Sequence, residues 1–185
     1  ASAISTADSQ HHWLTHEKQQ ALIDARPILA IDDQALTKLF QTDDVQSSLG
    51  ERAGAVQQNL DAWMCDWKES WVARNDAHML RELDGCKELL ANVESKPLTD
   101  EQSRAVICFD NRVQVIASAG SGKTSTMVAK AVYALHRELV SAQSIVMLAF
   151  NKDAAKELQA RVASSLNRLG IENVEIEAKT FHALG

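Results

Sequence analysis

The sequence predicts an α/β protein in which a helical N-terminal region precedes the first part of a domain with a parallel sheet. Apolar side chains recur at helical spacing through most of residues 13–93. After Pro97 the pattern changes to strand, helix, strand, helix, strand, an order that calls for a parallel sheet with helical crossovers. A glycine-containing loop joins the first of these strands, residues 113–116, to the helix that follows it.

The composition permits a packed core and argues against several protein classes. Of the 185 residues, 45% are hydrophobic and 24% are charged. The three cysteines have no C-x-x-C spacing, which disfavours a disulfide scaffold or a zinc site and fits a reducing cytoplasm. No apolar run approaches the roughly 18 residues of a membrane span. Residues 1–12 are mostly small and polar, and we expect a flexible end rather than a signal peptide.

Charge divides the chain into two parts. The net charge is −6, and residues 1–96 hold 9 basic and 16 acidic side chains, whereas residues 97–185 hold 10 and 9. The acidic part is a poor candidate for nucleic-acid contact, and binding by the other part must rely on individually placed residues. Pro97 disfavours a helical conformation at Lys96. We therefore predict a helical accessory region over 13–96 and a second domain over 97–185.

The helical region carries recognisable start and stop signals. Thr15 is a predicted N-cap, Pro27 is expected to end the first helix, and Asp32 or Asp33 to start the next. A longer helical stretch follows from Ala53, with large apolar residues on one face: Leu60, Trp63, Met64, Trp67 and Trp71. We interpret this stripe as packing between helices, with a partner-docking surface as the alternative. The polar residues 74–76 either break the helix or lie on its outer face.

Residues 97–185 are predicted to alternate between strands and helices. Residues 125–139 are predicted to be a helix, and the apolar run 145–150 a strand buried on both faces. A helix over 153–169 ends at Gly170, and residues 174–178 form a third strand.

The loop Ala117-Ser118-Ala119-Gly120-Ser121-Gly122-Lys123-Thr124 has the residues of a phosphate-binding loop. Glycines let the backbone amides approach phosphate oxygens, and the following helix directs its positive end at them. Lys123 supplies a full charge for the outer phosphates, and Thr124 a hydroxyl for Mg²⁺. The general pattern starts with Gly where this chain has Ala117, and a simple Gly/Ser turn is the alternative interpretation.

Four segments together resemble superfamily 1 DNA helicases of the UvrD/Rep type, and among them the bacterial helicase IV group. They are residues 98–102 (Leu-Thr-Asp-Glu-Gln), the loop 117–124, residues 148–155 (Leu-Ala-Phe-Asn-Lys-Asp-Ala-Ala) and residues 179–185 (Lys-Thr-Phe-His-Ala-Leu-Gly). The helical region is similar, more loosely, to the one that precedes the motor core in helicase IV, on residues 13–15, 74–75 and 93–95. The resemblance implies a partial RecA-like ATP-binding domain over 97–185 and explains Ala117, which is common in the family.

The resemblance implies an ATP site. All eight loop residues would bind ATP, with Lys123 and Thr124 as the catalytic pair and Thr124 on Mg²⁺. Gln102, 21 residues before Lys123, would contact adenine, because an amide can both donate and accept. The alternative is a capping box between Thr99 and Gln102. Relatives often have Arg directly after the Thr, where this chain has Ser125, so that nucleotide contact is in doubt.

The resemblance also implies contacts with single-stranded DNA from Phe150, Asn151, Thr180 and His182. Strand ends are where open α/β sheets place ligands. The alternatives are that Phe150 belongs to the core, that Asn151 caps the next helix, and that Thr180 and His182 brace their loop.

In the family, the acidic pair, the arginines and the second RecA-like domain come after the segment that ends here at Gly185. We therefore expect the full-length protein to be an ATP-dependent DNA helicase or translocase, 3′ to 5′ by resemblance, and this chain alone to be inactive. A nucleotide-sensing module whose helical part docks a protein partner is the alternative. A small-molecule kinase is disfavoured, because the motifs lie at their helicase offsets.

Overall fold

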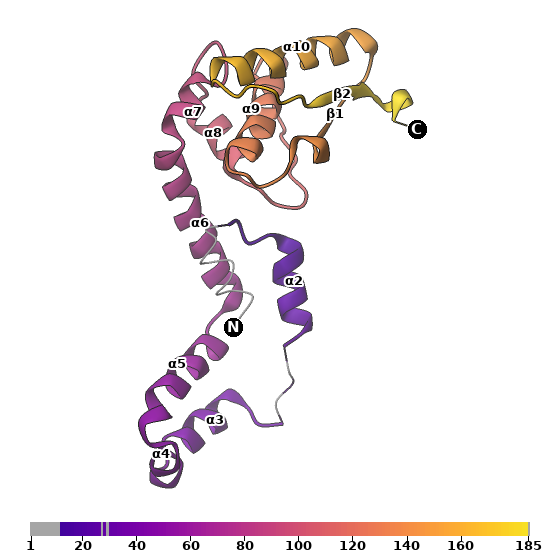
Figure 1. Cartoon of the computed structure of the whole chain (residues 1–185). Coiled ribbons are helices and arrows are strands. Elements are labelled where there is room, and N and C mark those ends of the chain that lie inside the picture. Colours follow the sequence, from indigo (N-terminus) through magenta and orange to yellow (C-terminus); the bar gives the residue numbers. More distant parts are fainter. Residues whose placement is uncertain (1–11, 27, 29, 185) are drawn as a thin grey trace. The chain divides into compact units, whose positions relative to one another are not determined.

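The computed structural model describes residues 12–26, 28 and 30–184 (Figure 1). The chain divides into two compact units. Residues 14–76 form the helical unit, and Trp13 together with residues 77–184 forms the α/β unit. The predicted domain boundary after Lys96 remains a prediction.

The helices of the helical unit begin at caps that the sequence identifies. Thr15 accepts a hydrogen bond from Lys18 N (3.4 Å), and Asp32 accepts one from Ala35 N (2.8 Å). Both predicted N-caps are confirmed, whereas Pro27 lies outside the described residues. The elements are α2 (His16–Asp24), α3 (Asp33–Phe40), α4 (Asp43–Leu49), a 3₁₀ turn (Gly50–Arg52), α5 (Ala53–Met64) and the first part of α6 (Trp67–Gly85).

The long helical stretch predicted from Ala53 is interrupted earlier than expected. Helix α5 ends at Met64, and the Asp66 carboxylate accepts from the backbone N–H groups of Lys68 (2.9 Å) and Glu69 (3.1 Å) to start α6. The polar residues 74–76 do not break α6. A local aspartate that caps free N–H groups therefore sets the boundary, and a cluster of polar residues does not.

Asn75, within this polar cluster, faces inward and does not lie on the outer face of α6. Its side chain is buried and forms two hydrogen bonds with the backbone of Leu14, 61 positions away. The N–H of Leu14 donates to Asn75 Oδ1 (3.0 Å), and Asn75 Nδ2 donates to the Leu14 carbonyl (3.0 Å). Asn75 therefore fixes the chain ahead of α2 against α6.

The tryptophan stripe packs within the helical unit. Trp63 and Trp67 meet edge-to-face with ring centroids 5.9 Å apart, and Trp67 lies 5.6 Å from Trp71, which is buried. The Arg26 guanidinium stacks over Trp63 (4.8 Å) and Trp67 (4.6 Å) and donates to the Trp63 carbonyl (2.8 Å). Contacts inside the chain thus cover much of the stripe.

The α/β unit contains a parallel strand pair joined by a helix, which confirms the predicted fold class. Strands β1 (Val146–Ala149) and β2 (Glu177–Thr180) pair with Val146 opposite Glu177 and Ala149 opposite Thr180. Helix α10 (Lys152–Arg168) connects them and packs on both strands and on α9 (Figure 1). The other elements are α7 (Lys87–Asn92), α8 (Asp100–Ile107), α9 (Lys123–His136) and 3₁₀ turns at Ala142–Ser144 and Phe181–Ala183.

The strand predictions required three corrections. Residues 113–116 form no strand and are exposed, Ile116 to 87%. β1 is not buried on both faces, since Met147 is buried but Val146 is 46% exposed. The third predicted strand begins at Glu177 rather than at residue 174, because its bounds follow from pairing with β1. In each case the outcome depends on a neighbouring strand, which apolar patterning does not specify.

The core of the α/β unit is contiguous, and helices α9 and α10 contribute much of it. On α10 the predicted inward face is confirmed, with Ala155, Leu158, Val162 and Leu166 buried. On α9 the buried apolar side chains are Val128, Ala129, Ala131, Val132, Tyr133 and Ala134. Residues of α7, α8 and the end of α6 join them: Met79, Cys86, Leu89, Leu90, Val93, Val106 and Ile107.

Candidate functional site

The loop before α9 has a backbone that requires glycine at two positions. Gly120 and Gly122 have φ values of +77° and +87°, in the left-handed region that side chains disfavour. Gly122 is also the N-cap of α9, and a Cβ there would collide with Nε2 of Gln102. The loop can therefore adopt this path only with glycine at position 122.

Lys123 bends back over the loop that precedes it. Its ammonium donates to the carbonyls of Ala117 (2.9 Å) and Ser118 (2.6 Å). Ser121 Oγ also donates to the Ser118 carbonyl (2.8 Å). Thr124, the second residue of α9, is exposed. The loop thus holds a full positive charge beside the N-terminus of a helix, an arrangement suited to an anion.

Gln102 adopts the predicted alternative and also reaches the loop. Its Oε1 accepts from Thr99 N (2.9 Å), and its own N–H donates to Thr99 Oγ1 (3.3 Å), which completes the capping box of α8. Its Nε2 donates to the Ser121 carbonyl (2.9 Å). The amide therefore connects the first turn of α8 to the loop, and adenine contact remains a prediction.

Lys130 joins the other end of α8 to α9. Its Nζ donates to the carbonyls of Ala105 (3.0 Å), Val106 (3.3 Å) and Cys108, at the C-terminus of α8. Burial lowers the pKa of Lys130. A cation at a helix C-terminus compensates the free carbonyls there, so this lysine fastens the two helices together.

The far end of α9 is anchored through a carboxylate on α6. Glu82 accepts from Tyr133 OH (2.8 Å) and from Arg137 Nη2 and Nε (2.9 Å each). Burial raises the pKa of Glu82, but the Tyr133 hydrogen bond and the Arg137 charge outweigh it, so the pKa is lowered. Burial and the neighbouring Glu82 raise the pKa of the Cys86 thiol to about 11.

Two exposed phenylalanines follow the paired strand ends. Phe150 comes directly after β1 and is 87% exposed, and Phe181 comes directly after β2 and is 62% exposed. Ala149 and Thr180 pair across the sheet, and parallel strands lie about 4.8 Å apart, so the two phenylalanines leave the sheet at the same end. We call this carboxyl end of the strand pair, with Phe150 and Phe181, the strand edge. Phe181 was not predicted as a DNA contact, although it follows its strand at the same offset as Phe150.

The other predicted DNA contacts have mixed surroundings. Asn151 caps α10, since its Oδ1 accepts from Ala154 N (2.8 Å). Thr180 is buried, which fits a bracing role, whereas His182 is exposed in the 3₁₀ turn after β2. Structure brings Phe150, Asn151, Thr180 and His182 to one end of the strand pair.

Among residues 12–26, 28 and 30–184, no cluster of three or more His, Cys, Asp or Glu side chains could hold a metal ion. Within the same part of the chain, no helix is both long enough and apolar enough to cross a membrane.

A glycine loop that leads into a Lys-Thr helix start, next to a parallel strand pair with a helical crossover, defines the beginning of a P-loop domain of the RecA-like class. Residues 98–185 match the family model of the UvrD/REP helicase N-terminal domain.

The chain is similar to several curated helicases. It is 31% identical to DNA helicase IV of Escherichia coli (strain K12) over 185 residues, which is 98% of this chain and 25% of that protein. It is 36% identical to the ATP-dependent DNA helicase PcrA of Staphylococcus epidermidis over 50% of this chain and 12% of that protein. It is 33% identical to the ATP-dependent DNA helicase Rep of Buchnera aphidicola over 48% of this chain and 13% of that protein. The chain thus spans a quarter or less of each of these relatives.

Proposed function

We propose that this chain is the ATP-binding part of an ATP-dependent DNA helicase or translocase. The observation that carries the proposal is the juxtaposition, within one unit, of the Lys123 loop and a strand edge bearing Phe150 and Phe181. A motor must hold nucleotide and nucleic acid on one rigid framework, since motion requires each to affect the other. The names of the relatives support the same activity for the full-length protein.

Lys123 and Thr124 take the central roles at the nucleotide. The Lys123 ammonium exchanges the Ala117 and Ser118 carbonyls for the outer phosphate oxygens of ATP, which carry full negative charge. The exposed Thr124 hydroxyl is a hard oxygen donor of the kind that Mg²⁺ accepts, and it would hold the ion that neutralises charge on the phosphates. The remaining residues of loop 117–124 contribute backbone N–H groups.

Gln102 contacts the adenine base. Its Nε2 donates one N–H to the Ser121 carbonyl and its Oε1 accepts from Thr99 N, so the second N–H and the second lone pair of the amide are the groups for adenine. Adenine offers a donor and an acceptor side by side, which matches this N–H and lone pair.

Single-stranded DNA binds across the strand edge. Phe150 and Phe181 stack on bases, and such contacts contribute about 1–3 kcal/mol per base. His182 and the free amide N–H₂ of Asn151 meet the phosphate backbone, while Thr180 braces the turn. Movement is 3′ to 5′, which follows the resemblance alone. The free cysteines fit a cytoplasmic protein. The helical unit, with its tryptophan stripe, is the candidate surface for a protein partner.

The decisive experiment is the ATPase rate of the full-length protein with and without single-stranded DNA. We expect strong stimulation by DNA and a loss of about 100-fold or more in Lys123→Ala, because removal of one preorganised charge contact at a transition state costs that much. Lys87→Ala, an exposed lysine on α7, is the matched control. The chain of 185 residues alone should not hydrolyse ATP at a useful rate.

Binding at the strand edge has a separate test. Affinity for single-stranded DNA should fall with salt with a log–log slope of about −0.7 for each phosphate neutralised. Phe150→Ala and Phe181→Ala should weaken binding with little change in that slope. An ATPase that is indifferent to DNA, together with a flat salt response, would favour the nucleotide-sensing module instead.

A further inference from the structure

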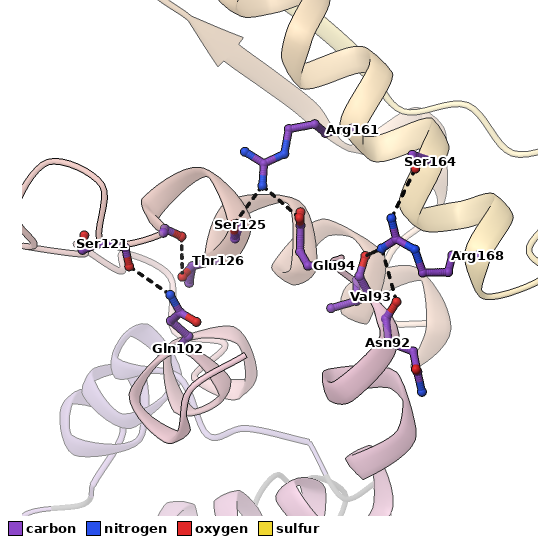
Figure 2. A network of polar contacts seen from close by, with 11 residues as sticks. Asn92, Val93, Glu94, Gln102, Ser121, Ser125, Thr126, Arg161, Ser164 and Arg168 are labelled. Atoms are coloured by element: carbon purple, nitrogen blue, oxygen red, sulfur yellow. Dashed lines mark hydrogen bonds and ion pairs between the residues drawn. The ribbon is translucent and has the colours of Figure 1, made fainter. Parts of the chain in front are cut away.

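Arg161, on α10, connects three elements of the α/β unit (Figure 2). Its Nη2 donates to Ser125 Oγ on α9 (2.8 Å) and to Glu94 Oε2 on the segment after α7 (2.9 Å). The two N–H bonds of one planar nitrogen point in fixed directions, so both acceptors are held by one guanidinium. Glu94 is largely buried and forms an ion pair with it.

Ser125 lies in the first turn of α9, directly after Thr124. On one side of this turn, Thr126 is buried and its Oγ1 donates to the Gly122 carbonyl (3.2 Å). On the other side, Ser125 accepts from Arg161. Because a helix turn is rigid, a displacement of Ser125 displaces Thr124 and Lys123 with it.

Arg161 also lies on the helix that starts at the strand edge. Helix α10 begins directly after its N-cap, Asn151, which follows the exposed Phe150. On the proposed function, α10 contacts DNA at its N-terminus and holds the loop before α9 through Arg161. Binding of either ligand can therefore shift the position of α10, which is the physical requirement for coupling.

We propose that Arg161 is a positioning residue that couples the strand edge to the nucleotide loop. Its hydrogen bond to Ser125 fixes the position of the first turn of α9, and its ion pair with Glu94 fixes the position of the guanidinium. The proposal rests on the proposed function, and it assigns to Arg161 and Ser125 the transmission of DNA occupancy to Lys123 and Thr124. Neither residue needs to contact ATP or DNA.

The same helix offers a matched control. Arg168, two turns further along α10, donates to the carbonyls of Val93 (2.8 Å) and Asn92 (3.3 Å) and to Ser164 Oγ (3.3 Å), and no hydrogen bond described for it reaches α9 (Figure 2). Replacement of either arginine removes a contact with the segment that follows α7, but only Arg161 also forms a hydrogen bond to α9.

The test measures the ratio of ATPase kcat with DNA to kcat without DNA in the full-length protein. We expect Arg161→Gln and Ser125→Ala to lower this ratio about fivefold or more, and Ser125→Thr, which keeps an acceptor hydroxyl, to stay within about twofold of wild type, because a charge-assisted hydrogen bond is lost only in the first two. Arg168→Gln should keep the wild-type ratio even if it lowers thermal stability.

Two outcomes would overturn the proposal. If wild type is stimulated by DNA and Arg161→Gln and Ser125→Ala keep its ratio, the coupling role is wrong while the proposed function stands. If Arg168→Gln lowers the ratio as much as Arg161→Gln, the effect belongs to packing of α10 in general. A wild type without stimulation would overturn the proposed function and this coupling together.

Discussion

Different kinds of contact stabilise the interiors of the helical unit and of the α/β unit. In the α/β unit, side chains from α6 to α10 bury a contiguous apolar core. In the described residues of the helical unit, the buried apolar side chains are Leu14, Phe40 and Trp71. Its other main contacts are the Arg26–tryptophan stack and the hydrogen bonds between Asn75 and Leu14. Burial stabilises the α/β unit, which carries loop 117–124, and a few directed polar contacts order the helical unit.

The largest effect expected from this comparison is the loss of stability when core volume is removed from the α/β unit. Leu158 is buried on α10, and Leu158→Ala should lower the free energy of unfolding by about 3 kcal/mol through lost burial and a residual cavity. Chemical denaturation of the 185-residue chain measures this change.

Leu39, an exposed leucine on α3, provides the control. Leu39→Ala should change the free energy of unfolding by less than about 0.5 kcal/mol. Equal losses in the two variants would remove the distinction between a unit stabilised by burial and one that is not.

A smaller effect is expected when the polar contact of the helical unit is removed. Asn75→Ala leaves the Leu14 N–H without its partner, while the Leu14 carbonyl keeps its hydrogen bond from Gln19 Nε2 (2.9 Å), and should cost about 2 kcal/mol. Hydrogen exchange of the Leu14 amide should accelerate while amides of α9 and α10 keep their protection.

Asn92→Ala is a suitable comparison, because Asn92 Nδ2 donates to the Glu88 carbonyl at an exposed position. Its stability should be close to that of wild type. If Asn75→Ala also leaves Leu14 exchange unchanged, the Asn75 contact does not order the chain ahead of α2.

The smallest effect is a pH dependence that we expect to arise in the α/β unit. The pKa of Glu82 is lowered in the folded chain, so its contribution to stability is full above the pKa of an unfolded glutamate, about 4.3, and is lost as pH falls through the folded value. Glu82→Gln should remove this part of the acid sensitivity. Thermal unfolding measured from pH 7 to pH 3 compares the two proteins.

Glu88→Gln, which changes an exposed side chain on α7, should leave the acid sensitivity unchanged. The same pH profile for wild type and Glu82→Gln would show that the Tyr133 and Arg137 contacts do not stabilise the charged carboxylate in solution.

The sequence predicted the features whose cause is local. The caps at Thr15, Asp32 and Thr99 and the inward face of α10 depend on residues within a few positions, and all are confirmed. The phosphate-binding role of loop 117–124 stays a prediction, which rests on glycine, lysine and threonine at a fixed spacing.

Features that depend on distant partners were missed. Residues 113–116 have the apolar character of a strand, but a strand forms only where another strand accepts its hydrogen bonds. The partner of Asn75 lies 61 positions away, and Ser125 and Glu94 lie 36 and 67 positions from Arg161. Helical spacing says which face a residue occupies, but it does not say what that face meets.

Lys130 has a further consequence for the choice of ligand. Together with Gln102 it fastens α8 to α9 and its loop at both ends of α8, which makes the two helices one frame of set dimensions. Gln102, proposed to hold the base, is on α8 and contacts Ser121, and Lys123, proposed to hold the phosphates, is on α9. On the proposed function, a ligand with phosphates but no base would therefore contact α9 and leave the Gln102 amide on its Ser121 and Thr99 partners.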